Sequence, residues 1–306
     1  MKTLIVGAGA TGGYIGTKLI DAGRDVTFLA RRPTASRLRK DGVRVELSNG
    51  RTVAKSVEVQ ASGDLDGQFD VVVLAVRSDA VNADLLKDIA PAIAPTTRIL
   101  PIVNGMSHVQ TLVDAYDATR VLGGTARLAT SLRTDGVIQE VAPGVNIELG
   151  ALDGIGENYL PAVAAELDVN GITVDIRDDI ISAMWAKFAF IAATASLTCL
   201  MGAVIGPINA AQGGSSVAMQ IVEEVAAVAA AESHPLGATA RSVLEQNVTD
   251  VRSTFAPSMF RDLTSQRPVE VSVLIDLADR ARRWQIATPL LDAAIVRIEL
   301  AVSGGT

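Results

Sequence analysis

The stretch TLIVGAGATG, residues 3–12, decides the fold, because a short apolar run passes directly into glycines spaced as G-x-G-x-x-G. A helical pattern of apolar residues follows and closes at Gly23, and a second apolar run covers residues 25–30. A strand, a glycine turn, a helix and a second strand within about thirty residues form the context that a dinucleotide-binding fingerprint requires. The sequence therefore predicts a βαβ unit at the start of the chain.

Each glycine of this turn has a distinct predicted purpose. Gly7 permits the tight turn, Gly9 lets the backbone approach a pyrophosphate, and Gly12 lets the helix pack close to the strand. The pyrophosphate would lie at the helix N-terminus, where unpaired N–H groups and the helix dipole favour negative charge. We expect the whole turn to contact a cofactor, through Gly7, Ala8, Gly9, Ala10, Thr11 and Gly12. The alternative is a glycine-rich strand-to-helix turn that binds nothing.

The end of the second apolar run bears on which dinucleotide is bound. Proteins that bind NAD usually place Asp or Glu there to hold the ribose 2′-hydroxyl. This chain has Phe28-Leu29-Ala30-Arg31-Arg32, without an acid. A guanidinium suits a 2′-phosphate, because it is permanently charged and offers a fork of donors. We therefore predict NADP(H), held by Arg31, with a solvated basic turn as the alternative.

Further apolar runs extend the predicted sheet. Residues 69–76 (FDVVVLAV) are typical of a central parallel strand buried on both faces, and residues 98–103 form another run. Arg77 and Asn104 follow these runs, so we expect both at the carboxyl edge, where such sheets bind ligands. The alternative is ordinary loop chemistry, since Asn104-Gly105 is a common turn pair. Two weaker strand patterns cover residues 136–150 and 172–176.

The second half of the chain has helical patterns. Asp178-Asp179 can cap a helix that runs to Met201. Further helical patterns cover residues 217–232, 238–253, 270–284 and 290–302, and residues 212–216 are predicted to form a loop. We predict a Rossmann domain (a doubly wound parallel sheet) at 1–175 that binds NADP, and an all-α domain at 176–306 for substrate binding or dimerisation.

Composition limits the classes of function. The 306 residues are 49% hydrophobic and 20% charged, with a net charge of −7, which favours two packed domains and argues against nucleic acid as a partner. The single cysteine, Cys199, fits a reducing cytoplasm, and His108 and His234 lack the spacing of metal ligands. Residues 188–205 carry no charge, and we interpret them as a buried helix rather than a membrane span.

Lys187 is unusual in this chain. It is the only lysine after Lys87, while the same part of the chain contains thirteen arginines. Lys187 also lies within the apolar pattern Met184-Trp185-Ala186-Lys187-Phe188. A lysine whose pKa shifts on burial is suited to proton transfer. The alternative is a lysine that extends from a helix edge into solvent.

Four features in order resemble the ketopantoate reductase (2-dehydropantoate 2-reductase) family over nearly the whole chain. They are the turn from Gly7 to Gly12, Asn104-Gly105-Met106, the WAKF stretch at 185–188, and SMFRD at 258–262 followed by Glu270. The resemblance implies a helical second domain of the 6-phosphogluconate-dehydrogenase-like type. It also implies a cytoplasmic, NADP-dependent oxidoreductase acting on CH–OH groups, with a place in pantothenate biosynthesis.

The family's reaction reduces a 2-oxo acid to a 2-hydroxy acid, and the resemblance assigns roles to particular residues. Lys187 would donate the proton, with the catalytic Glu270 beside it, close to the nicotinamide and its ribose. Asn104 would lie between cofactor and substrate, and Ser258 would contact the substrate. Arg77 stands where family members usually carry lysine. For Glu270 and Ser258 the alternatives are a solvated glutamate and a capping serine near helix N-termini.

Three positions depart from the family pattern. Ile191 and Ala195 replace asparagines one turn and two turns after the lysine, and Phe255 replaces one three residues before Ser258. We therefore predict that Ile191 and Ala195 line a less polar substrate pocket, for a 2-oxo acid more apolar than ketopantoate or for another carbonyl or imine compound. The alternatives are a related dehydrogenase acting on 3-hydroxy acids or opines, and a non-catalytic NADPH sensor. A homodimer is also possible on the apolar second domain.

Overall fold

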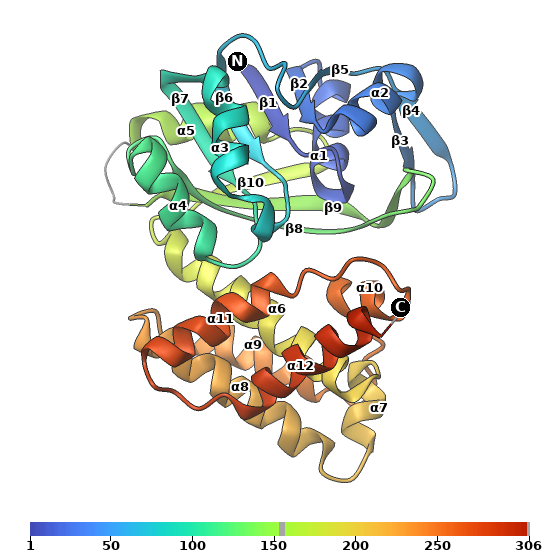
Figure 1. The fold of residues 1–306 in the computed structure, drawn as a ribbon, viewed down its shortest axis with the longest axis vertical. Helices are drawn as coiled ribbons and strands as arrows, with labels where there is room; N and C mark the ends of the chain where they lie inside the picture. The colour runs from blue at the N-terminus through green and yellow to red at the C-terminus, as the bar shows by residue number, and fades with distance from the viewer. Residues whose placement is uncertain (153–156, 305–306) are drawn as a thin grey trace. The chain divides into compact units, whose positions relative to one another are not determined.

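A computed structural model describes residues 1–152 and 157–304, and it divides into two compact units (Figure 1). The first unit comprises Met1–Val103 and His108–Ile180. The second comprises Asn104–Ser107 and Ile181–Thr306, of which the last two residues lie outside the description. The short segment Asn104–Ser107 therefore belongs with the helical part of the chain, although it lies within the first unit in sequence.

The first unit is built on a five-stranded parallel sheet in the order β5-β2-β1-β6-β7. Its strands are β1 (Lys2–Val6), β2 (Asp25–Ala30), β5 (Glu58–Ala61), β6 (Phe69–Leu74) and β7 (Ile93–Pro101). Side chains from alternate positions of β1 enter two different apolar clusters, with Ile5 in one and Leu4 and Val6 in the other. Both faces of the sheet are thus covered, which confirms the predicted doubly wound class.

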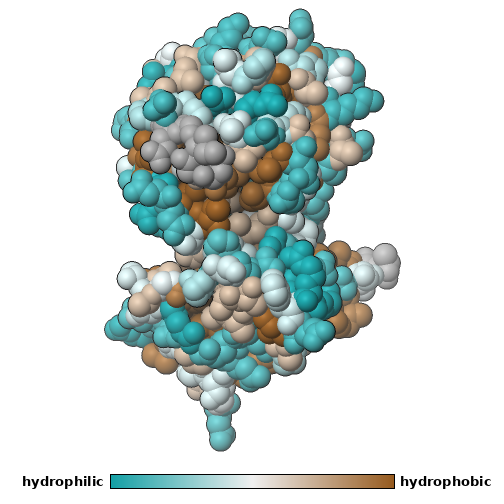
Figure 2. Space-filling view, turned by 90° about the vertical axis from the view of Figure 1, so that its left-hand side faces the viewer, coloured by the Kyte–Doolittle hydropathy of each residue, from teal (hydrophilic) through white to brown (hydrophobic). Residues whose placement is uncertain are grey.

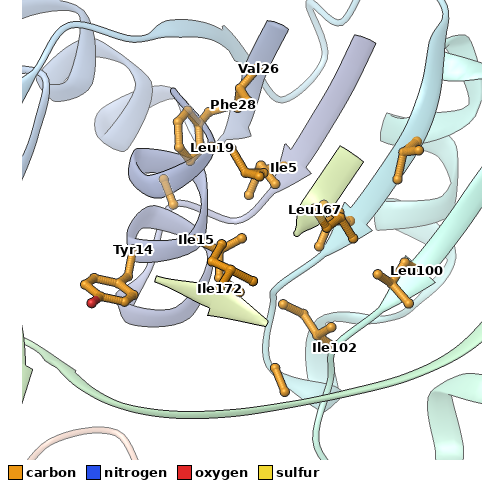
Figure 3. Packing of buried hydrophobic residues seen from close by; sticks show 14 of the residues in the cluster. Ile5, Tyr14, Ile15, Leu19, Val26, Phe28, Leu100, Ile102, Leu167 and Ile172 are labelled. Carbon is orange, nitrogen blue, oxygen red and sulfur yellow. The ribbon is translucent and has the colours of Figure 1, made fainter. Parts of the chain in front are cut away.

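Helix α1 covers one face of this sheet at close range. In Figure 3, Ile15 and Leu19 of α1 (Ala10–Asp21) face Ile5 and Phe28 of the strands. A Cβ at Gly16 would lie 2.2 Å from the Phe28 ring, so the glycine is needed for this approach. The other helices of this unit are α2 (Arg32–Asp41), α3 (Ala83–Ile89), α4 (Ser107–Tyr116), whose first residue belongs to the second unit, and α5 (Leu160–Leu167).

A second sheet, in the order β10-β9-β3-β4 with β8 paired to β9, completes the first unit. Its strands are β3 (Val43–Glu46), β4 (Thr52–Lys55), β8 (Leu122–Leu132), β9 (Ile138–Ala151) and β10 (Ile172–Ile176). The sequence patterns at 136–150 and 172–176 identified β9 and β10. They did not identify β3, β4, β5 and β8, which are short or carry glycine and polar residues among their apolar positions.

The second unit is helical. It contains α6 (Ile180–Met201, whose first residue lies in the first unit), α7 (Ile205–Ala210), α8 (Gly214–Ala231), α9 (Ala238–Thr249), α10 (Ser258–Thr264), α11 (Ser272–Arg283) and α12 (Pro289–Ser303). The short helices α7 and α10 were not predicted. The predicted loop at 212–216 is wrong after Gly213, because α8 begins at Gly214 directly after the left-handed Gly213 (φ +82°).

Helix α6 explains the uncharged stretch in the sequence. By length and composition it could cross a membrane, but 67% of its apolar 18-residue window is buried. This is typical of the core helix of a soluble protein. Hydrophilic residues cover much of the surface of each unit that is visible in Figure 2, as expected when such helices and strands are buried inside.

Candidate active site

The glycine turn between β1 and α1 has the geometry that its sequence predicts. Gly7 has φ +97°, and a Cβ there would lie 2.7 Å from the Ala75 carbonyl oxygen. A Cβ at Gly12 would lie 2.0 Å from the Gly7 carbonyl oxygen, so no other residue fits there. A Cβ at Gly9, in contrast, would meet nothing within 4 Å. The turn is therefore closed on its packed side at Gly7 and Gly12 and open at Gly9, where a bound group could approach the backbone.

The N-terminus of α1 is suited to an anion. Its N-cap residue, Gly9, has no side chain to satisfy the first N–H groups of the helix, and the first turn holds no acidic residue. The remaining members of the predicted cofactor contacts, Ala8, Ala10 and Thr11, lie in or beside this first turn. Unpaired N–H groups and the helix dipole both favour a phosphate at this position.

The two arginines after β2 have different environments. Arg32 forms an ion pair with Asp64 at 2.7 Å. Arg31 is exposed at the N-cap of α2, and its side chain makes no hydrogen bond or ion pair with residues 1–152 or 157–304. The structure therefore leaves Arg31, rather than Arg32, available to an added anion.

Arg77 follows β6 at the carboxyl edge of the sheet. Its guanidinium donates two hydrogen bonds to the Asp79 carboxylate, from Nε at 3.1 Å and from Nη2 at 2.9 Å. This fork is partly solvent-exposed, with 40% of the Arg77 side chain and 49% of the Asp79 side chain accessible. A phosphate would thus compete with Asp79 for Arg77, and a role for Arg77 at the cofactor stays a prediction.

The second unit brings Asn104 and Glu270 together. The Asn104 Nδ2 donates a hydrogen bond to Glu270 Oε2 at 3.3 Å, across 166 positions of sequence. Asn104 lies in a turn that depends on Gly105, whose φ is +81°. Glu270 lies two residues before α11 and is partly buried. An amide donor and a carboxylate thus occupy one place in the helical unit.

Asp276 was not predicted from the sequence, yet it anchors this turn. Its Oδ2 accepts hydrogen bonds from the backbone N–H groups of Met106 at 2.8 Å and Ser107 at 2.9 Å. Its Oδ1 accepts a hydrogen bond from Arg280 Nε at 2.8 Å. No motif in the sequence could indicate these contacts, because an aspartate within an amphipathic helix looks like an ordinary surface residue.

Lys187 lies on the partly accessible face of α6. Ala186, Lys187, Phe190 and Ile191 are each partly exposed, whereas the residues from Ala192 to Cys199 are buried. The four lie within one face of the helix, because positions three and four apart are neighbours. These four residues form a stripe along α6 that is apolar except for the lysine, which lies near one end. Ala195 is fully buried, so its predicted contact with the substrate stays a prediction.

Residues around Ser258 extend this stripe. Ser258 is exposed as the first residue of α10, and Phe255 precedes it in the loop. The Phe255 ring packs against the Phe190 ring with centroids 5.8 Å apart and an interplanar angle of 58°. Phe255 keeps 40% of its surface exposed. The structure thus joins the accessible face of α6 to the segment that precedes Ser258.

Trp185, two residues before Lys187 on α6, is buried and packs against other parts of the helical unit. Trp185 stacks on His234 with centroids 5.7 Å apart, and the Arg280 guanidinium lies 5.4 Å from the Trp185 centroid. Arg280 also pairs with Glu232, which accepts a hydrogen bond from Trp284 Nε1 at 2.8 Å. Burial opposes ionisation of Glu232, but the Trp284 hydrogen bond and the nearby arginines outweigh it and lower the pKa of this carboxyl.

Metal ligands do not cluster in the described part of the chain, where no three His, Cys, Asp or Glu side chains could share an ion. Burial raises the pKa of the Cys199 thiol to about 12, so Cys199 is an unreactive core residue at neutral pH. The polar groups that remain for chemistry are therefore the lysine, the carboxylates and the amide described above.

Comparisons with known proteins identify relatives over nearly the whole chain. Two family models match, "Ketopantoate reductase PanE/ApbA" over residues 3–154 and its C-terminal counterpart over residues 179–300. An uncharacterized oxidoreductase of Bacillus subtilis, YkpB, is 30% identical over 98% of both chains. A 2-dehydropantoate 2-reductase of Mesorhizobium japonicum is 27% identical over 100% of this chain and 99% of its own.

Solved structures show the same fold. A 2-dehydropantoate 2-reductase from Geobacter metallireducens, 26% identical, superposes with a TM-score of 0.85 over 98% of this chain and 100% of its own. A D-mandelate dehydrogenase solved with NADH and anilino(oxo)acetate, 20% identical, superposes with a TM-score of 0.89 over 99% of both chains. The chain described here belongs to the ketopantoate reductase family of oxidoreductases.

Proposed function

We propose that this protein reduces a 2-oxo acid to a 2-hydroxy acid with NADPH, and that Lys187 donates the proton. The observation that carries the proposal is the pairing of the Asn104 amide with the Glu270 carboxylate, at 3.3 Å, in the same unit that presents Lys187 on an accessible helix face. These are the three polar residues that the family resemblance assigns to the chemistry. Residues 1–175 would bind NADP(H), and residues 176–306 would hold the substrate and form a homodimer.

When bound, NADPH would supply the hydride for the carbonyl carbon, and negative charge would then develop on the carbonyl oxygen. The Lys187 ammonium stabilises this charge and then transfers its proton to the oxygen. The Glu270 carboxylate orients the ammonium, and the Asn104 amide, held by Glu270, donates toward the reacting groups. The exposed hydroxyl of Ser258 contacts the substrate.

The preference for NADP(H) over NAD(H) rests on Arg31. Its side chain is exposed after β2 and makes no bond to the described residues, so it is available to a 2′-phosphate. The glycine turn fits the pyrophosphate, because Gly9 is open and the α1 N-terminus is uncapped. The D-mandelate dehydrogenase solved with NADH is similar to this chain in fold only, so its cofactor carries no argument against NADPH here.

The substrate is proposed to be less polar than ketopantoate. Ile191 is partly exposed next to Lys187 on α6, where the family pattern has an amide side chain. A hydroxyl of a polar substrate left without a partner there would cost about 1–3 kcal/mol. A cytoplasmic location follows from the same proposal, since NADPH and free 2-oxo acids are metabolites of that compartment.

The test follows NADPH absorbance with purified protein, ketopantoate and a panel of 2-oxo acids with apolar side chains. Oxidation of NADPH that depends on a 2-oxo acid and is lost in Lys187→Ala supports the proposal. No oxidation with any 2-oxo acid overturns it. Higher kcat/KM for ketopantoate than for every apolar 2-oxo acid would keep the reaction and overturn the proposed change in the pocket.

A further inference from the structure

We propose that Phe190 and Phe255 form an aryl-binding site, and that the substrate is an aromatic 2-oxo acid. This inference rests on the proposed function and names the substrate class of the same site. It starts from the geometry of the helical unit, where an aromatic pair adjoins the face that carries the lysine.

The first step concerns the position of Phe190. It lies three residues after Lys187 in α6, and side chains at this spacing are neighbours on the helix surface, with Cβ atoms about 5–6 Å apart. Ala186 and Ile191 share the partly accessible face, and neither offers a hydrogen-bonding side chain. A substrate whose carbonyl oxygen reaches the Lys187 ammonium would therefore place its side chain against an apolar surface.

The second step concerns Phe255. Its ring meets Phe190 in a tilted arrangement, with centroids 5.8 Å apart and planes at 58°. This tilted arrangement lies within the range of centroid distances at which aromatic rings attract each other, and it leaves parts of both rings open to a third ring. Phe255 is 40% exposed and Phe190 is partly exposed, so both residues keep accessible surface that a substrate could contact.

The third step is that hydrogen bonds hold the backbone on both sides of the Phe255 side chain. The backbone N–H of Phe255 donates to Ser253 Oγ at 3.2 Å, and Arg261 Nη1 donates to the carbonyl of the next residue, Ala256. Arg261 lies one turn after Ser258 in α10, so the same short helix presents the serine and holds the backbone beside Phe255. A side chain carried on an ordered backbone loses less freedom on binding, which favours affinity and selectivity for a flat partner.

The experiment compares two substrates that differ only in aromaticity, 3-phenyl-2-oxopropanoate and 3-cyclohexyl-2-oxopropanoate. Both keep a methylene group beside the carbonyl, and kcat/KM is calculated on the keto form of each compound, because only the phenyl compound has an enol conjugated with its ring. We measure kcat/KM for both with NADPH in the wild-type protein and in Phe190→Leu, Phe255→Leu and Phe260→Leu. Phe260 is buried in α10, so its variant carries the same chemical change away from the accessible face.

We expect the wild-type protein to prefer the phenyl compound. The ratio of the two kcat/KM values should fall about 3- to 10-fold in Phe190→Leu and Phe255→Leu, as the loss of one aromatic contact implies. Phe260→Leu should leave the ratio unchanged, and thermal unfolding of each variant shows whether it is folded. Equal or better turnover of the cyclohexyl compound, or a ratio unmoved by both site variants, overturns the aryl site while the reductase activity stands. Absence of NADPH oxidation with every 2-oxo acid overturns the proposed function as well.

Discussion

The Asp276 carboxylate accepts hydrogen bonds from the backbone N–H groups of Met106 and Ser107, at 2.8 and 2.9 Å. It thereby fixes the turn that carries Asn104, whose amide donates to Glu270. Arg280, which bonds to the other oxygen of Asp276, also lies over the ring of Trp185, two residues before Lys187. One carboxylate therefore supports the turn that holds Asn104 and is linked to the helix that presents Lys187.

We expect Asp276→Ala to lower kcat/KM by about 10-fold, because two backbone donors lose their partner and Asn104 is no longer held toward Glu270. The measurement is a double-mutant cycle with Asn104→Ala. If Asp276 acts through Asn104, the double variant will lose little more than Asn104→Ala alone. If the fold-losses of the two single variants multiply in the double variant, Asp276 acts independently of the Asn104 amide, which would contradict this expectation. Asp279→Ala, on an exposed aspartate of the same helix, is the control.

Replacement of Lys187 separates chemistry from binding. In Lys187→Ala we expect kcat to fall about 100- to 10,000-fold, the range typical for loss of a general acid. The dissociation constant of NADPH, measured by fluorescence titration, should change little, because the predicted cofactor contacts lie elsewhere. Lys87→Ala, on an exposed lysine, should keep wild-type kcat. A kcat near that of the wild type in Lys187→Ala would assign the proton to another group.

Arg31 and Arg32 are neighbours with different predicted contributions to cofactor choice. Arg31→Ala should raise KM for NADPH about 10-fold or more and leave KM for NADH nearly unchanged, since only NADPH carries the 2′-phosphate. Arg32→Ala should shift this ratio much less, because the Arg32 guanidinium already pairs with Asp64. Equal effects on both cofactors in Arg31→Ala, or a larger effect in Arg32→Ala, would show that the 2′-phosphate is bound elsewhere.

The sequence was sufficient for four strands of the first sheet, β1, β2, β6 and β7, because their decisive features are local. The spacing of Gly7, Gly9 and Gly12 and the apolar run of β6 each require one kind of structure whatever surrounds them. Strands β3, β4, β5 and β8 were missed because they are short or carry glycine and polar residues among their apolar positions, so their apolar pattern is weak. The place of β3 in the second sheet also depends on a distant partner, since Val45 pairs with Val53 on one side and with Ile138, 93 positions later, on the other. The pairing with Ile138 is absent from any short window of sequence.

The same reasoning explains what the sequence showed of the site. Lys187 and Glu270 could be singled out from a rare residue type and from family spacing, but Asp276 could not, because its partners lie about 170 positions earlier. Phe255 was recognised only as a lost asparagine. Its packing against Phe190 depends on how α6 and the loop before α10 meet, which no residue pattern indicates.

Glu140 gives a prediction about pH and stability in the first unit. It is buried, and it accepts hydrogen bonds from the Tyr14 hydroxyl and from the N–H and hydroxyl of Ser48. Burial opposes its ionisation, but these hydrogen bonds outweigh burial and lower the pKa of the Glu140 carboxyl. A carboxyl with a lowered pKa in the folded state stabilises the fold above its unfolded pKa of about 4.3, and this contribution is lost as pH falls through the folded value.

We therefore expect Glu140→Gln to lower the free energy of unfolding by about 1–3 kcal/mol at pH 7, and the difference from the wild-type protein to shrink below about pH 4. Denaturant unfolding at several pH values measures this. All three tyrosines lie in the first unit and both tryptophans in the second, so the tyrosine and tryptophan signals report different units. The loss should occur in the tyrosine-reported transition. A loss of equal size at pH 7 and pH 3.5 would contradict the ionised role of Glu140, because a packing defect does not depend on the charge of this carboxyl.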